Sequence, residues 1–265
     1  MTLRPLCSLA ALAAALPALP AEPEWISLFD GKTLSGWNDP AKKSPPGNSF
    51  AVEDGCIKVV ARPKLREDLI TARDFADFEL TFEWKVASRS NSGVKYLLQD
   101  QAILDADKVK PKTRFEDLVG HELEHREGNR AKPGPKGIIE AYTVAFEYQV
   151  IDDTGHADAR RGGLYQAGAL YSLMPAAKPM ARPVGEWNEG RIVRRGNHVE
   201  HWLNGVKVVD TGLDAPEIHE RLAQRWKGNP VFTLLTARPK KRTPIILQNH
   251  NDEAWFRNLR IRELR

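Results

Sequence analysis

An alternation of apolar and polar residues with period two is the feature that most constrains this chain. In an extended strand successive side chains point to opposite faces, so each alternating run predicts a strand with one buried face. The runs occupy residues 78–86, 145–151, 192–195, 198–203, 206–209, 245–248 and 254–262. Gly196-Asn197 and Asn204-Gly205 separate three consecutive runs and predict tight turns. Short strands joined in this way favour an all-β sandwich of two antiparallel sheets.

Two segments depart from this pattern. Residues 101–139 are charged and end in a Pro/Gly-rich stretch, which predicts an insertion between two strands with short helices around 102–108 and 114–126. A further helix is expected over 215–227. We therefore expect one β-sandwich domain over residues 22–265, with a partly helical insertion.

The first 21 residues have the composition of a secretory signal peptide. Arg4 is their single charge, an Ala/Leu-rich stretch follows, and small residues precede the expected cleavage near Ala21. The stretch is too short to span a bilayer comfortably, and no later segment is apolar enough to do so. The sequence therefore predicts an exported protein, periplasmic or extracellular, with no membrane span.

Charge and cysteine content exclude several classes of protein. The net charge is +4 and is spread along the chain without a dense basic run, so a nucleic-acid partner is not expected. The two cysteines are too few for a disulfide scaffold or a four-thiolate zinc site. Cys56 remains alone once the signal peptide is removed, and we expect it in the core.

His121-Glu122-Leu123-Glu124-His125 matches the HExxH pattern of zinc peptidases. A zinc-binding helix of this kind is long and half apolar, because it supports the metal from the interior. Here glycines bracket the motif and its neighbours are charged. We interpret it as a solvated helix, with a zinc peptidase as the less favoured alternative.

Three polar groups are candidates for a site. Glu147 and Gln149 share one face of a predicted strand whose other face is apolar, so they project from the sandwich, either into a concave sugar-binding surface or into solvent. The turn 152–158 brings carboxylates near His156, which could hold a metal or act in acid–base chemistry. His250 lies in a loop between two strands, where an imidazole is a candidate base.

Seven tryptophans are present, and indole faces often line carbohydrate clefts. Most tryptophans in a domain of this size nevertheless belong to the core, and Trp202 and Trp255 are expected there.

Several motifs in order resemble one family. They are Trp25–Trp37 (WISLFDGKTLSGW), Asn91-Ser92-Gly93-Val94, Glu147–Asp153 (EYQVIDD), Gly168-Ala169-Leu170-Tyr171, Gly185-Glu186-Trp187-Asn188, Gly196–Gly205 (GNHVEHWLNG), Leu247-Gln248-Asn249-His250 and Phe256-Arg257-Asn258-Leu259. Together they are similar to the 3-keto-disaccharide hydrolases, also described as 3-keto-glucoside-1,2-lyase/3-keto-2-hydroxy-glucal hydratases. The resemblance implies a concanavalin-like jelly roll that cleaves 3-keto-glycosides by elimination across C1–C2 followed by hydration, which is net hydrolysis.

The resemblance also implies roles for residues. His250 would be the base near C2, Lys95 would supply positive charge to the enolate, Tyr171 would donate a proton, and Glu147 would act at the same centre. Gln149, Asn91, Gln248, His156 and Asn188 would bind the sugar. Glu147 with His156 would bind a divalent metal ion, if the reaction uses one. The expected partner is an oligosaccharide or glycoside.

A non-catalytic carbohydrate-binding module is the alternative function. It predicts an open aromatic strip without convergent ionisable groups. An enzyme instead requires Lys95, Glu147, Gln149, Tyr171 and His250 to meet in one hollow.

Overall fold

The computed structural model describes residues 23–39, 47–105, 114–125, 139–237 and 239–264. The predicted signal peptide and parts of the predicted insertion lie outside this range. Among the described residues, no helix combines the length and apolar character needed to cross a membrane.

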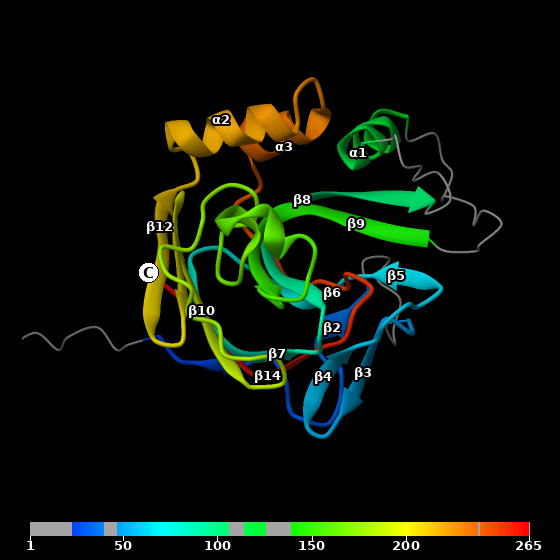
Figure 1. Ribbon diagram of the computed structural model, residues 1–265, viewed down its shortest axis with the longest axis vertical. Coiled ribbons are helices and arrows are strands. Elements are labelled where there is room, and N and C mark those ends of the chain that lie inside the picture. Colours follow the sequence, from blue (N-terminus) through cyan, green and yellow to red (C-terminus); the bar gives the residue numbers. More distant parts are fainter. Residues whose placement is uncertain (1–22, 40–46, 106–113, 126–138, 238, 265) are drawn as a thin grey trace, which may run out of the picture.

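Two β-sheets face each other across an apolar core, which confirms the predicted sandwich (Figure 1). The larger sheet has the order β12 (Val206–Gly212), β11 (His198–Leu203), β10 (Asn188–Arg195), β7 (Phe78–Val86), β14 (Ala254–Glu263), β4 (Cys56–Val59) and β3 (Phe50–Glu53), with β1 (Ile26–Ser27) beside β14. The smaller sheet has the order β2 (Trp37–Asn38), β6 (Leu69–Phe75), β13 (Thr243–Leu247), β8 (Asn91–Asp105), β9 (Ile139–Ile151) and β5 (Leu65–Glu67). Pairing is antiparallel except between β5 and β9, which are parallel.

The alternation in β7 sets the core. Its inward residues are Phe78, Leu80, Phe82, Trp84 and Val86, and all are buried. The rings of Phe78 and Phe82 contact aromatic rings of the smaller sheet. Phe82 packs edge-on against Tyr148 of β9, with ring centres 5.3 Å apart. Cys56 is also buried, as predicted.

The two predicted turns are confirmed. Arg195 and His198 are paired across Gly196-Asn197, and Leu203 pairs with Val206 across Asn204-Gly205. Asn204 and Gly205 both have positive φ, which matches the right-handed twist of the flanking strands.

The core positions of β11 differ from the prediction. Val199, His201 and Leu203 point inward, so Trp202 lies on the outer face of the larger sheet, where the Arg191 guanidinium is 4.7 Å from its ring centre. Trp255 is likewise only partly buried, beneath Lys58 and Lys85. Alternation defines which residues share a face, but the docking of the second sheet decides which face is inside.

His201 is fully buried in the position expected for the indole. Its Nδ1–H donates to Gly168 O (3.0 Å), and its Nε2 accepts from the Tyr96 hydroxyl (2.9 Å). Burial lowers the pKa of His201 to about 4. The ring is therefore neutral and satisfied within the core.

The helices gather beyond β8 and β9, away from β7 and β14 (Figure 1). They are α1 (Phe115–Glu124), α2 (Pro216–Arg225) and α3 (Pro230–Thr236), and two 3₁₀ turns, η2 (Ala159–Arg161) and η3 (Gly163–Tyr165), follow β9. The predicted helices at 114–126 and 215–227 are confirmed within one or two residues. The helix predicted at 102–108 is wrong over 102–105, which extend β8 by pairing with residues 139–142 of β9.

Candidate active site

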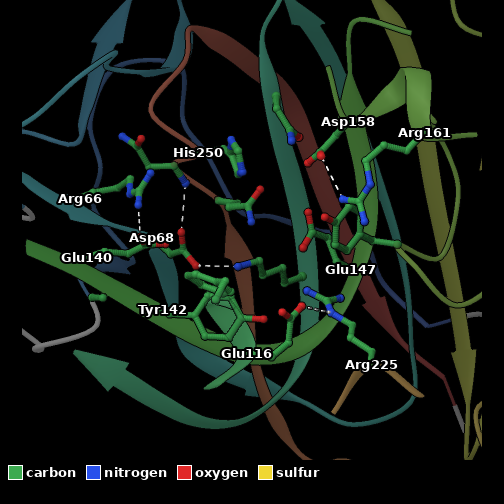
Figure 2. Close-up of a pocket in the computed structure, with 17 residues that line it drawn as sticks. Arg66, Asp68, Glu116, Glu140, Tyr142, Glu147, Asp158, Arg161, Arg225 and His250 are labelled. Atoms are coloured by element: carbon green, nitrogen blue, oxygen red, sulfur yellow. Dashed lines mark hydrogen bonds and ion pairs between the residues drawn. The ribbon is translucent and has the colours of Figure 1, made fainter. Parts of the chain in front are cut away.

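A cavity of 390 Å³ opens on the outward face of the smaller sheet. The floor comes from β8 and β9, and the walls come from α1, α2, the segment after β9 and the segment after β13. Figure 2 shows Arg66 and Glu140 at one end and Asp158, Arg161 and Arg225 at the other. The lining residues are Arg66, Asp68, Asn91, Lys95, Phe115, Glu116, Glu140, Ala141, Tyr142, Glu147, Asp158, Arg161, Tyr171, Arg225, Gln248, Asn249 and His250.

Strand pairing places Lys95 directly opposite Glu147 on the cavity floor. Their neighbours Val94, Tyr96, Phe146 and Tyr148 point into the core, so period two forces Lys95 and Glu147 outward.

Gly93 provides the space in which the Glu147 side chain lies. A Cβ added at Gly93 would be 2.4 Å from Glu147 Oε1 and 2.8 Å from Glu147 Cγ and Cδ. The φ of Gly93 is not positive, so its backbone conformation does not call for glycine. Glycine is required at this place in the Asn-Ser-Gly motif because the Glu147 side chain lies where a Cβ would be.

Lys95 is 2 % exposed, and an acidic partner compensates its charge. Its Nζ donates to Asp68 Oδ2 (3.1 Å) and to Thr143 Oγ1 (3.0 Å). Asp68 is held in turn by Thr143 and by the backbone N–H of Asn249. Gln248 bridges Lys95 and Glu147 when its amide oxygen faces Lys95 Nζ (3.1 Å) and its amide nitrogen faces Glu147 Oε1 (3.2 Å).

Glu147 differs from every other carboxylate lining the cavity. The other four form ion pairs, which are Arg66–Glu140, Lys95–Asp68, Arg225–Glu116 and Arg161–Asp158. Within the described part of the chain Glu147 has no ion pair. Burial raises the pKa of its carboxyl group, although the positive charges of Lys95, His250 and Arg225 oppose the shift. A carboxyl group whose pKa is raised in this way is protonated more readily than an exposed one, which suits it to exchange a proton with a ligand.

His250 stands at the rim, with its side chain 40 % exposed. Its Nδ1 is buried and lies 3.9 Å from Asp252 Oδ2, too far for a hydrogen bond. Nε2 is therefore the nitrogen left for a ligand in the cavity, with a carboxylate behind the ring.

His156, His250 and Asp252 lie close enough together to hold a metal ion, with ligand atoms within 4.8 Å of one another. Glu147, the other expected ligand, is not part of this group. His156 fits the role poorly, because its Nδ1 accepts the backbone N–H of Asp158 (3.0 Å). In the neutral ring the proton is then on Nε2, the nitrogen that faces Asp252 at 3.8 Å. A metal at Nε2 would require that proton to move to Nδ1, which would break the hydrogen bond that Nδ1 accepts from the Asp158 N–H.

Tyr171 lines the cavity, and the Arg225 guanidinium lies over its ring, 5.0 Å from the ring centre. Burial raises the pKa of Tyr171, which makes its hydroxyl a hydrogen-bond donor rather than a ready acid.

The remaining predicted residues divide into two groups. Asn91 and Gln248 line the cavity. Gln149 is fully buried beside it, and an amide nitrogen turned toward Glu147 donates to Oε1 (3.2 Å) and to Ser92 O (3.1 Å). His156 does not line the cavity but contacts the His250 ring, with centres 5.9 Å apart. Gln149 and His156 are therefore placed to support lining residues rather than to touch a sugar.

Asn188 lies elsewhere. It begins β10 in the larger sheet, opposite Trp84, and is 2 % exposed. Its side-chain oxygen accepts from Arg182 N (2.8 Å) and from Asn204 Nδ2 (2.9 Å). The expectation that Asn188 binds sugar is replaced by a structural role, because both contacts fix loops of that sheet.

The HExxH motif does not form a zinc site in the described chain. It ends α1, and the rings of His121 and His125 stack with centres 4.3 Å apart while both side chains are exposed. Neither histidine belongs to a group of three ligands among the described residues. The interpretation as a solvated helix holds.

Sequence reasoning missed most of the charged partners of the site: Arg66, Asp68, Glu116, Glu140, Arg161 and Arg225. The triplet Arg66-Glu67-Asp68 directly before the apolar Leu69-Ile70 was an available signal, because charged groups at a strand end often face a site. No comparable signal marked Arg225, because its position depends on how α2 docks.

Fold and site together define a β-sandwich protein with a deep polar cavity on one sheet, of the kind that carbohydrate-active proteins use. Residues 24–262 match the family model of the 3-keto-alpha-glucoside-1,2-lyase-like domain. A 3-keto-disaccharide hydrolase of Bacteroides thetaiotaomicron is 32% identical over 256 residues, covering 91% of this chain and 78% of that protein. The chain belongs to this family, as the motifs predicted.

Solved structures agree on the fold. Two crystal structures of candidate glycosyl hydrolases from Parabacteroides distasonis are each 22% identical, with TM-scores of 0.66 and 0.57. Both matches cover 91% of this chain, and they cover 94% and 100% of the respective structures.

Proposed function

We propose that this protein cleaves 3-keto-glycosides by eliminating the C1 substituent across C1–C2 and then adding water. The observation that carries the proposal is the meeting of Lys95, Glu147, Tyr171 and His250 in one cavity, where Glu147 alone among the lining carboxylates lacks an ion pair in the described chain. The convergence favours an enzyme over a binding module.

The first step removes the proton at C2, which the neighbouring C3 ketone acidifies. His250 Nε2 accepts that proton, and the Asp252 carboxylate behind the ring stabilises the imidazolium that forms. The electron pair moves to the C3 oxygen as an enolate. The Lys95 ammonium supplies positive charge toward it.

The second step breaks the bond between C1 and the leaving oxygen, and a C1–C2 double bond forms. Glu147, whose pKa is raised by burial so that it is protonated more readily than an exposed carboxyl group, donates a proton to the leaving oxygen. Tyr171, the donor expected from the resemblance, is better suited to hold a hydroxyl by a hydrogen bond. Water then adds at C1 and gives one proton to the Glu147 carboxylate, while His250 returns its proton to C2.

A divalent ion held by His250 and Asp252 would polarise the C3 carbonyl. A metal-bound His250 nitrogen cannot also accept the C2 proton, and His156 fits poorly as a third ligand. The proposed steps therefore use side chains of the chain alone. Unchanged turnover after chelation supports this assignment, and loss of turnover that a divalent ion restores would overturn it.

Turnover of a 3-keto-disaccharide in D₂O tests the reaction class. Elimination and hydration place deuterium at C2 of the released sugar, whereas direct hydrolysis does not. The released sugar incubated alone gives the background exchange. His250→Ala should abolish deuterium incorporation together with cleavage. Near-wild-type turnover by this variant would remove His250 from the mechanism, and binding without any turnover would favour the carbohydrate-binding module.

A further inference from the structure

A second chamber of 470 Å³ adjoins the cavity. The two hollows share four lining residues, Glu116, Arg161, Tyr171 and Arg225, so they meet at that wall. The chamber is completed by Arg114, Leu164, Tyr165, Ser172, Arg221 and Gln224. A molecule seated at Glu147 can therefore extend past Arg161 and Arg225 into this space.

The charge of the chamber contrasts with that of the cavity. Arg66, Lys95, Arg161 and Arg225 face five carboxylates in the cavity, whereas the chamber has four guanidinium groups and one carboxylate, that of Glu116. The positive groups come from separate elements. Arg114 precedes α1, Arg161 ends η2, and Arg221 and Arg225 lie one turn apart on α2.

Arg221 has more spare hydrogen-bonding capacity than Arg161 or Arg225. Its Nη1 donates to Leu173 O (2.8 Å), and within the described ranges it forms no ion pair. Arg225 is shared between Glu116 and the Ser172 hydroxyl, while Arg161 pairs with Asp158 and donates to the Tyr165 hydroxyl. A guanidinium with free N–H groups suits bidentate binding of an oxyanion.

We infer that the chamber is the leaving-group subsite, and that it selects leaving groups carrying an anionic substituent such as a carboxylate, sulfate or phosphate. The inference rests on the function proposed above, in which Glu147 protonates the leaving oxygen; the adjoining chamber is then the space into which the leaving group extends. An anion next to Arg221 contributes charge-assisted hydrogen bonds that a neutral substituent cannot make.

The test compares two 3-keto-glucosides, of 4-carboxyphenol and of 4-carbamoylphenol, which are similar in shape and differ in charge. The wild-type protein should have a KM at least about tenfold lower for the carboxylate. Arg221→Gln should raise KM for the carboxylate substrate and so remove that preference, with a smaller effect on KM for the carbamoyl substrate. Arg160→Gln is the matched control, because Arg160 is exposed and lines neither hollow. Because the two phenols differ in acidity, the ratio of the variant's KM to the wild-type KM is determined for each substrate, and the two ratios are compared.

The outcomes separate the two proposals. A preference for the carboxylate that Arg221→Gln abolishes supports the chamber, and a 4-sulfophenyl substrate then shows whether it also takes a tetrahedral anion. Equal KM values for both substrates overturn the chamber and leave the reaction intact. If neither substrate is cleaved, the proposed reaction fails. Calorimetry with the unoxidised glucosides then tests the chamber. Tighter binding of the carboxylate glucoside than of the carbamoyl glucoside supports the anionic subsite, and equal binding overturns it.

Discussion

Gly93→Ala is the sharpest perturbation that the site offers, because it acts on Glu147 without touching it. The added Cβ would lie 2.4 Å from Glu147 Oε1. An ordinary contact needs about 3.4 Å or more, so the carboxyl group must move by roughly 1 Å. Gly93 has no positive φ, and alanine at that position leaves the backbone unstrained. The variant should therefore fold and misplace one catalytic group.

The expected cost follows from that displacement. Misplacing a reacting group by about 1 Å reduces the rate by about 100-fold. We expect kcat/KM for a 3-keto-disaccharide to fall by this factor, with the midpoint of urea unfolding close to that of the wild type. Steady-state release of the 3-keto sugar measures the first quantity, and tryptophan fluorescence measures the second.

A double variant tests whether the loss of activity in Gly93→Ala comes from the displaced Glu147 side chain. Gly93→Ala combined with Glu147→Asp shortens the acidic side chain and relieves the contact, so the double variant should be less impaired than the product of the two single effects predicts. Wild-type kcat/KM in Gly93→Ala with unchanged stability would refute the reasoning. It would mean that the position of Glu147 does not limit the reaction.

Three further predictions concern titratable groups. Glu147→Gln should lower kcat by at least about 100-fold. In the wild type, activity should fall with rising pH as Glu147 loses its proton, and a pH–rate profile of the variant should lack this fall. Asp68→Asn leaves the buried Lys95 ammonium without its carboxylate and should destabilise the fold by about 3–5 kcal/mol, measured by urea unfolding. The pKa of His201 is lowered from 6.5 in the unfolded chain to about 4 in the folded protein. As the pH drops from 6.5 to 4, the unfolded chain therefore binds a proton that the folded protein does not, and the free energy of unfolding should fall by about 3 kcal/mol in total. His201→Phe should flatten this part of the stability–pH curve.

Each of the three has a decisive contrary result. An unchanged pH profile in Glu147→Gln would exclude Glu147 as the acid. Wild-type stability in Asp68→Asn would show that Lys95 does not need the pair. For the third, the exposed His219 provides the control, and the reasoning fails if His219→Gln alters the slope as much as His201→Phe does.

Local patterns alone determined much of this protein. The alternation in 78–86 and the turns at Gly196-Asn197 and Asn204-Gly205 predicted strands and hairpins correctly, because strand periodicity and turn geometry depend on neighbouring residues. The same reasoning placed Glu147 on the face opposite Phe146, and the ordered motifs gave the family.

The tertiary structure decided what depends on partners distant in the chain. It placed His201 rather than Trp202 in the core, extended β8 through residues predicted to be helical, and moved Asn188 to the other sheet. It also paired Lys95 with Asp68 and brought Arg225 to the cavity. The alternating pattern is symmetric between the two faces of a strand, and the pKa of a carboxyl group depends on which distant charges pack against it. Both are set only when the sheets and helices dock.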